Sequence, residues 1–243
     1  MKICIAISTY VSDKASDDRI KIIKECLDSF INVNAKVVIV NDASTNKLHN
    51  ELLETYKDKF HIINRTYNGG IAKCKNTAIK YFEENEYDIC FLIDDDMKVV
   101  SPDFVKQYVD AIENTGIEHL CYQVPGDHKN TKNIEKNDFN VIQSDHTNGC
   151  MLVLTKNIVK NIGYFKVLPH KYGHEHSNYT LRCIIHGFAP GFIDVVDSNN
   201  FIQLIGQSVE IHSGTRIHGA EFDENEHAAF ENLQNEKYIE CNE

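Results

Sequence analysis

The sequence predicts an α/β fold in which a mostly parallel central sheet is flanked by helices. Short β-branched runs alternate with longer helical segments in the first half of the chain, and the strand expected at Lys36–Val40 is apolar at every position after its first. A continuously apolar strand is typical of a parallel sheet that is covered on both faces. With 243 residues and 42% hydrophobic content, the chain is expected to form one domain around one sizeable core.

The expected elements of the first half form a β-α-β-α-β-α-β series. In chain order we expect a strand at Lys2–Ser8, an amphipathic helix at Ser16–Ile31, the strand at Lys36–Val40, a strand at His61–Asn64, a helix at Ile71–Glu84 and a strand at Ile89–Ile93. The parallel strands of such a series place their C-terminal ends along one edge, where open α/β sheets bind their ligands.

The second half of the chain contains fewer regular patterns. Ser101 is expected to cap a helix that has Pro102 in its first turn. The polar, lysine-rich segment Pro125–Asp138 is expected to be an exposed loop of the kind that often carries a binding site or a lid. Three further elements are expected: a strand at Asn148–Thr155, a helix at Asn178–His186 closed by Gly187, and an acidic helical tail from Glu221 that is solvated or faces another subunit.

Composition excludes several classes of protein. A formal net charge of −11 disfavours nucleic-acid partners, because such binding relies on basic side chains that release counterions. No apolar run reaches the roughly eighteen residues that cross a bilayer, and Lys2–Ile7 is too short for a signal sequence. We therefore expect a cytoplasmic chain, with a peripheral position on the inner face of a membrane as the alternative. The eight cysteines form no CxxC pair, and Cys4, Cys90, Cys121 and Cys183 lie in apolar runs, which predicts reduced core thiols.

Polar residues follow four of the expected strands. They are Ser8, Thr9 and Tyr10 after the first strand, Asn41 and Asp42 after the second, Asn68-Gly69-Gly70 after the third, and Asp94-Asp95-Asp96 after the fourth. Since these ends share one edge of the sheet, we expect them to converge on one crevice.

The three consecutive aspartates predict a cation site. Their mutual repulsion must be offset, and oxygen ligands suit Mn²⁺ or Mg²⁺. Alternation along an extended chain predicts that Asp94 and Asp96 face one way and Asp95 the other. The structural alternative is a cap for the following helix, which already has Ser101. Neither GxxxxGK[ST] nor GxGxxG is present, so the usual glycine-rich phosphate loops are excluded.

A series of motifs in the right order resembles the inverting glycosyltransferase family 2, which has the GT-A fold. The motifs are IAISTY, VIVNDAST, NGGIAKCKN, FLIDDD, NGCMLVLTKNIVKNIGYF and GHEHSNYTLRCIIHGF, which together span about residues 3 to 188. The resemblance implies transfer of a sugar from a nucleotide-sugar, with UDP favoured over GDP or dTDP, to an acceptor hydroxyl of a glycan, lipid-linked or protein acceptor. It also implies a nucleotide-sugar-binding half at 1–100 and an acceptor-binding half at 101–220, followed by the acidic tail at 221–243.

The resemblance implies a role for individual residues of the nucleotide-sugar site. Tyr10 resembles the aromatic that lies against the nucleobase, and Asp42 the acid that accepts a ring N–H. Lys75 stands where the family often has an arginine near the diphosphate. The remaining donor-site residues are Ser8, Thr9, Gly70, Asp95, Asn148 and Gly149, the last two within the NGC segment beside the donor sugar.

The resemblance also implies the metal ligands. Asp94 and Asp96 resemble the DxD pair, the first reaching the ribose or metal-bound water and the second ligating the metal. His212 resembles the late histidine that the family often adds, with His218 as its rival and a histidine in an exposed loop as the third reading.

The sequence departs from the family at the catalytic base. Family members commonly have Glu-Asp there, and this chain has Glu175 and His176. Either side chain can accept a proton, so the base is His176 or Glu175, unless both only orient the acceptor. Because the usual aspartate is missing, retention of the anomeric configuration is the alternative to inversion.

Three other functions are weighed against this one. A nucleotidyltransferase would begin with a glycine-rich loop, which Ile7–Tyr10 lacks. A sugar-binding protein that lost its chemistry would explain the altered base. A zinc site at His174 and His176 has no third or fourth ligand at suitable spacing. A homo-oligomer is compatible with all of them.

Overall fold

The computed structural model describes residues 1–128, 130–206 and 219–241. Its strands are β1 Ile3–Thr9, β2 Lys36–Asn41, β3 His61–Asn64, β4 Ile89–Asp94, β5 Met97–Val99, β6 His119–Cys121, β7 Lys132–Lys136, β8 Phe139–Ser144, β9 Met151–Thr155, β10 Phe192–Val195 and β11 Ile202–Leu204. Its α-helices are α1 Asp17–Phe30, α2 Lys47–Glu54, α3 Ile71–Glu84, α4 Phe104–Thr115, α5 Lys156–Ile162, α6 Glu175–Ile185 and α7 Ala220–Phe230, with short 3₁₀ turns at Ser198–Asn200 and Leu233–Asn235.

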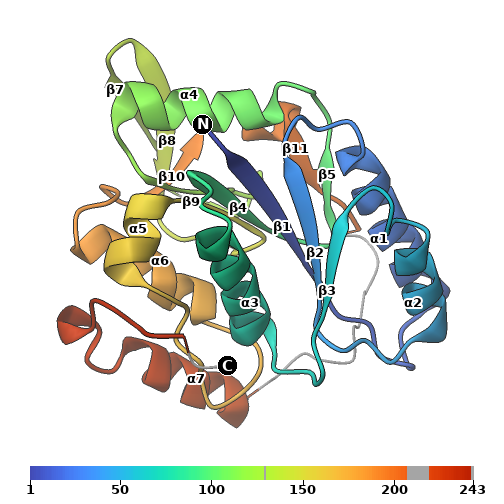
Figure 1. Ribbon diagram of the computed structural model, residues 1–243. Helices are drawn as coiled ribbons and strands as arrows, with labels where there is room; N and C mark the ends of the chain where they lie inside the picture. Colours follow the sequence, from blue (N-terminus) through green and yellow to red (C-terminus); the bar gives the residue numbers. More distant parts are fainter. Residues whose placement is uncertain (129, 207–218, 242–243) are drawn as a thin grey trace.

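The central sheet is mostly parallel, as predicted. Its six strands follow the order β3-β2-β1-β4-β9-β6 (Figure 1). The first four strands of this order are parallel, and β9 runs antiparallel to both β4 and β6. The C-terminal ends of the four parallel strands therefore lie along one edge.

Alternating side chains of the strands supply two cores. Ile5 and Ile7 of β1 lie in the core beneath α1 and α4, whereas Cys4 and Ala6 lie in the core beneath α3, α5 and α6. Helices cover both faces of the sheet (Figure 1), which is why its central strands are apolar on both sides. Burying one large apolar side chain contributes roughly 1.5–3 kcal/mol, so the two cores fix the strand register firmly.

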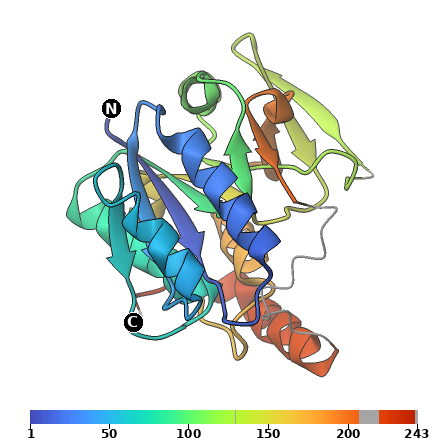
Figure 2. The same cartoon turned by 90° about the vertical axis from the view of Figure 1, so that its right-hand side faces the viewer.

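A separate antiparallel sheet of order β10-β8-β7 stands beside the central one (Figure 2). It corrects the expectation for Pro125–Asp138, which is not all loop because its second half contains β7. The β7 side chains are mostly exposed, so this edge strand is polar and its sequence has no apolar pattern from which a strand could be predicted. Asn137 and Asp138 both have positive φ, which is the requirement of a tight two-residue hairpin turn.

Three other boundaries differ from the sequence expectation. Helix α6 begins at Glu175 rather than Asn178, which places the candidate base residues in its first turn. Helix α4 begins at Phe104 with Asp103 as its cap, two residues after Ser101, whose hydroxyl accepts from Asp103 N at 3.3 Å. Strand β9 begins at Met151, so Asn148–Cys150 form a loop ahead of it.

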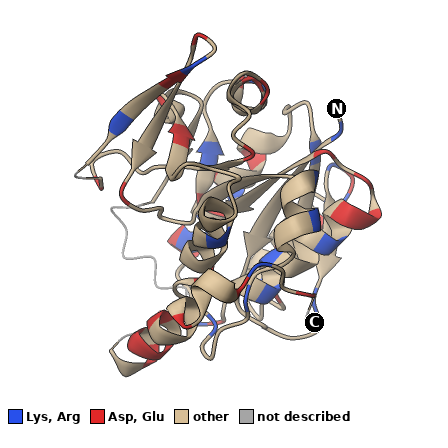
Figure 3. Ribbon diagram, turned by 90° about the vertical axis from the view of Figure 1, so that its left-hand side faces the viewer, with Lys and Arg blue, Asp and Glu red and all other residues tan. Residues whose placement is uncertain are grey.

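None of the eight cysteines, all of which lie among the described residues, forms a disulfide, and all except Cys241 are buried. Among the described residues no helix has the length and apolar character needed to cross a membrane. Acidic residues mark α7 (Figure 3), which packs against α6 through a hydrogen bond from Asn178 Nδ2 to Ala229 O. The acidic tail is therefore attached to the domain through its inner face.

Candidate active site

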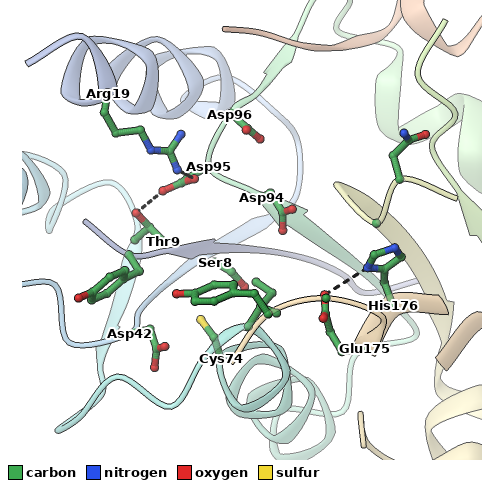
Figure 4. A pocket seen from close by; sticks show the side chains of 16 residues that line it. Ser8, Thr9, Arg19, Asp42, Cys74, Asp94, Asp95, Asp96, Glu175 and His176 are labelled. Atoms are coloured by element: carbon green, nitrogen blue, oxygen red, sulfur yellow. Dashed lines mark hydrogen bonds and ion pairs between the residues drawn. The ribbon is translucent and has the colours of Figure 1, made fainter. Parts of the chain in front are cut away.

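Side chains from several strand ends line one cavity of about 240 Å³ (Figure 4). The residues singled out from the sequence that line it are Ser8, Thr9, Tyr10, Asp42, Asp94, Asp95, Asp96, Asn148, Gly149, Glu175 and His176. Of the others, Gly70 and Lys75 lie immediately behind its wall, and His212 and its rival His218 lie outside the described residues. The cavity thus joins the ends of β1, β2 and β4 to the loop before β9 and the start of α6.

Asp95 is held by a buried network on the α1 side of the cavity. Its carboxylate forms an ion pair with Arg19 and accepts a hydrogen bond from the Thr9 hydroxyl (Figure 4). Since that hydroxyl donates to Asp95, His49 Nε2 donates to Thr9 Oγ1 at 2.9 Å. Burial lowers the pKa of His49, which keeps its imidazole neutral. This network links the end of β1 to the acidic turn, which consists of Asp94, Asp95 and Asp96.

All three aspartates line the cavity, and the Asp95 carboxylate is paired with Arg19 of α1 (Figure 4). Asp95 and Asp96 form a turn after β4, so the alternation expected for an extended chain does not apply to them. Lys75 Nζ lies 3.3 Å from Asp94 Oδ1 without a well-formed hydrogen bond, and Oδ1 of Asp96 is buried without any hydrogen-bond partner among the described residues. Burial, with the neighbouring aspartates, raises the pKa of Asp94 and brings that of Asp96 to about 7. The cavity therefore contains incompletely compensated acidic oxygens.

The Asp42 carboxylate, which follows β2, is held in place by three hydrogen bonds. Its Oδ1 accepts from Arg65 Nε at 2.7 Å and Gly69 N at 3.1 Å, and its Oδ2 accepts from Gly70 N at 2.8 Å. Gly70 has φ +82°, and a Cβ there would lie 2.5 Å from the carbonyl oxygen of Lys171. Only glycine fits at this position, and one lone pair of Asp42 Oδ2 stays available to a ligand.

Lys75 is fully buried on α3 rather than exposed in the cavity. Its Nζ donates to Gly149 O at 2.9 Å and approaches Asp94. Burial acts to lower its pKa, but the charges of Asp94 and Glu175 outweigh that effect and raise it, so the ammonium stays charged. This side chain therefore ties the loop before β9 to the acidic turn from behind.

Glu175 and His176 form a hydrogen-bonded pair at the opposite wall. His176 Nδ1 lies 3.2 Å from Glu175 Oε1, and both side chains line the cavity (Figure 4). Burial acts to raise the pKa of Glu175, but His176 and Lys75 outweigh it and the pKa is lowered, so the carboxylate is ionised. The His176 ring lies against Gly149, where a Cβ would come within 2.4 Å of its Cγ.

Five lining residues were missed by sequence reasoning: Arg19, Ile71, Cys74, Tyr172 and Gly173. Ile71 and Cys74 lie one helical turn apart in the NGGIAKCKN segment, so their common face was available from the helix period. Arg19 belongs to a helix that no motif connects with the acidic turn. Gly173 is the first residue of the GHEH segment and Tyr172 directly precedes it, so this segment was the signal for both.

The expected metal ligands are only partly assembled. Among the described residues, no third histidine, cysteine, aspartate or glutamate atom joins Asp94 and Asp96 at metal-binding separations. His174 and His176 also form no such group, and the His174 ring packs against Phe222 and Phe230. A zinc site at those two histidines is therefore absent from the described part of the chain.

The family model for glycosyl transferase family 2 matches residues 4–190. The chain belongs to glycosyltransferase family 2. An uncharacterized glycosyltransferase of Acanthamoeba polyphaga mimivirus is 36% identical over 218 residues, which cover 88% of this chain and 85% of that protein. The resemblance stated from the motifs is thus confirmed, and the chain is a glycosyltransferase by family.

Solved structures share the fold of this glycosyltransferase. The S. aureus TarS fragment in complex with UDP-GlcNAc gives a TM-score of 0.65 at 19% identity, covering 94% of this chain and 65% of that one. The Pyrobaculum calidifontis mannosyltransferase PcManGT, in complex with GDP-Man and Mn²⁺, gives 0.59 at 15% identity, covering 88% and 59%. The chain thus spans somewhat less than two thirds of these solved chains, and the likeness establishes the GT-A fold.

Proposed function

We propose that this glycosyltransferase is metal-dependent and transfers a sugar from a UDP-sugar to an acceptor hydroxyl with inversion. One observation carries the proposal: the under-compensated oxygens of Asp94 and Asp96 share a single cavity with the Asp42 acceptor and the Glu175–His176 pair. The complexes of TarS with UDP-GlcNAc and of PcManGT with GDP-Man and Mn²⁺ support a nucleotide-sugar donor and a divalent cation.

The donor is proposed to bind to the half formed by residues 1–100. Tyr10 follows β1, lines the cavity and would stack its ring against the nucleobase. Asp42 Oδ2 would accept a hydrogen bond from a ring N–H of the base through its remaining lone pair. The acceptor is proposed to enter from the half formed by residues 101–220, which supplies Asn148 and Gly149 to the cavity wall.

The acidic turn fits a divalent cation. Asp94 and Asp96 supply hard oxygen donors, and Asp96 has a buried oxygen with no hydrogen-bond partner among the described residues. These two carboxylates would hold Mn²⁺ or Mg²⁺, which when bound neutralises charge on the departing nucleoside diphosphate. Arg19 neutralises Asp95, and Lys75 limits the repulsion at Asp94. His212 is the third ligand that we propose.

His176 is proposed as the base, with Glu175 as its positioning partner. The ionised Glu175 carboxylate accepts from His176 Nδ1, which leaves the lone pair on Nε2 to take the proton of the acceptor hydroxyl. Attack from the face opposite the leaving diphosphate then inverts the anomeric centre. Glu175 is the competing base, because it also lines the cavity.

The test is release of nucleoside diphosphate from a panel of UDP-, GDP- and dTDP-sugars with Mn²⁺, with and without a chelator. We expect turnover with a UDP-sugar, loss of turnover on chelation, and an inverted anomer by NMR. Binding of a donor without any turnover would instead identify a sugar-binding protein, and undiminished turnover under chelation would refute the metal requirement.

Single variants identify the base. His176→Gln is expected to lower turnover by about 10²–10⁴-fold while the donor still binds, because the proton acceptor is lost. Glu175→Gln is expected to lower turnover less, since Nε2 remains. The reverse order would make Glu175 the base, and full activity of both variants would place the base elsewhere.

A further inference from the structure

A second group of metal-ligating side chains lies outside the active-site cavity. It consists of His128, in the loop between β6 and β7, and of Asp145 and His146, which follow β8. One potential ligand atom from each residue lies within 4.8 Å of the others. None of the three lines the active-site cavity, so the group is not part of the acidic turn.

The backbone brings Asp145 and His146 to the same side. Successive residues of an extended chain point to opposite sides, but here the Ser144 hydroxyl donates to His146 O at 2.8 Å and bends the segment. His146 Nδ1 then lies 2.8 Å from Asp145 Oδ1. The Asp145 and His146 side chains are 35% and 46% exposed, so solvent ions reach the group directly.

His128 completes the group from the loop between β6 and β7, and its ring nitrogens lack hydrogen-bond partners among the described residues. The side chain is only 5% exposed, yet neither ring nitrogen has a hydrogen-bond partner among the described residues. Nδ1 lies 3.5 Å from Asp145 Oδ1, and the His128 and His146 ring centroids are 4.4 Å apart. Buried imidazole nitrogens without partners are costly, so this ring is in position for a ligand that the protein itself does not supply.

We propose that His128, Asp145 and His146 bind one zinc-class divalent cation, distinct from the cation of the acidic turn. Two imidazoles and one carboxylate form a ligand set that suits Zn²⁺ with water in the fourth position. Mn²⁺ and Mg²⁺ are weaker candidates here, since they prefer oxygen donors and rank below Zn²⁺ for nitrogen ligands.

The cation would join two loops that frame the active site. Asp127, next to His128, already accepts from Asn148 Nδ2 at 2.9 Å, and Val124 N donates to Asn148 Oδ1 at 3.4 Å. Asn148 in turn lines the active-site cavity. A cation between His128 and the residues after β8 would add a third link at this point, and would hold Asn148 in place.

The test uses the full chain with the acidic turn disabled by Asp94→Asn and Asp96→Asn together. Zinc content after dialysis, and the visible absorption of bound Co²⁺, report the remaining site without any assay of activity. We expect one equivalent of Zn²⁺ and a Co²⁺ spectrum typical of four-coordination. His128→Gln or His146→Gln in that background should weaken Zn²⁺ binding by at least about tenfold, since even outer-shell changes cost that much.

The matched control is His170→Gln. His170 Nε2 pairs with Glu224 at 2.7 Å, but no third ligand joins that pair among the described residues. This variant should bind Zn²⁺ as its parent does. The proposal is overturned if the parent binds no Zn²⁺ after dialysis, or if His128→Gln and His146→Gln bind it unchanged. If a histidine variant does not melt cooperatively, its fold is lost and its zinc content is set aside. The zinc content of the parent, which carries Asp94→Asn and Asp96→Asn, then decides alone.

Discussion

The contact between Gly149 and His176 makes Gly149→Ala a sharp test of the active-site geometry. Gly149 has φ +75°, so any other residue there costs roughly 1–2 kcal/mol of backbone strain. The new Cβ would also lie 2.4 Å from His176 Cγ, which must retreat by about 1 Å to reach ordinary contact distance. A misplacement of that size costs about 10²-fold in turnover, or roughly 3 kcal/mol of transition-state stabilisation.

Gly187→Ala separates this effect from backbone strain. Gly187 has φ +84°, and a Cβ there meets nothing within 4 Å. Both variants should therefore lose stability in urea through backbone strain, and Gly149→Ala should lose more because its Cβ also overlaps His176. Only Gly149→Ala should lose turnover. Equal turnover in the two variants would show that the position of the His176 ring does not matter for the reaction.

Two further predictions concern stability. Asp95→Asn leaves the guanidinium of Arg19 buried without its counterion, so the free energy of unfolding in urea should fall by about 3–5 kcal/mol, and a fall below 1 kcal/mol would argue against a tight pair. The buried His119 has its pKa lowered from 6.5 to about 4 by desolvation. The unfolded state therefore binds a proton that the folded state does not, so stability is lost as pH falls from 6.5 towards 4. His119→Gln should remove about 3 kcal/mol of this pH dependence, measured by urea unfolding across that range. An unchanged pH profile would show that His119 is not the group responsible.

Elements governed by apolar periodicity were predictable from the sequence. The helix at Ile71–Glu84 and the strand at His61–Asn64 agree with the structure at both ends. Strand β7 was not predictable in this way, because its exposed polar residues are held by backbone hydrogen bonds to β8 and not by burial. The start of α6 was misplaced because His174 before it has positive φ and lacks a capping side chain, so the usual N-terminal signal is missing.

The active-site residues also fall into a group that was predictable from the sequence and a group that was not. Residues at strand ends, such as Asp42 and Asp94, follow from topology, since parallel strands share one edge. Arg19 and His49 do not, because their roles depend on tertiary contacts with Asp95 and Thr9 that no local pattern encodes. The His128–Asp145–His146 group was missed for the same reason: its members meet only through the packing of two loops.

The central claim is that Asp94 and Asp96 hold a divalent cation for the donor diphosphate. Calorimetric titration of UDP into the protein with Mn²⁺, with chelator, and into Asp96→Asn with Mn²⁺ tests it most directly. UDP should bind tightly only in the first of these titrations. Equal affinity in all three would mean that the acidic turn binds no cation for the donor.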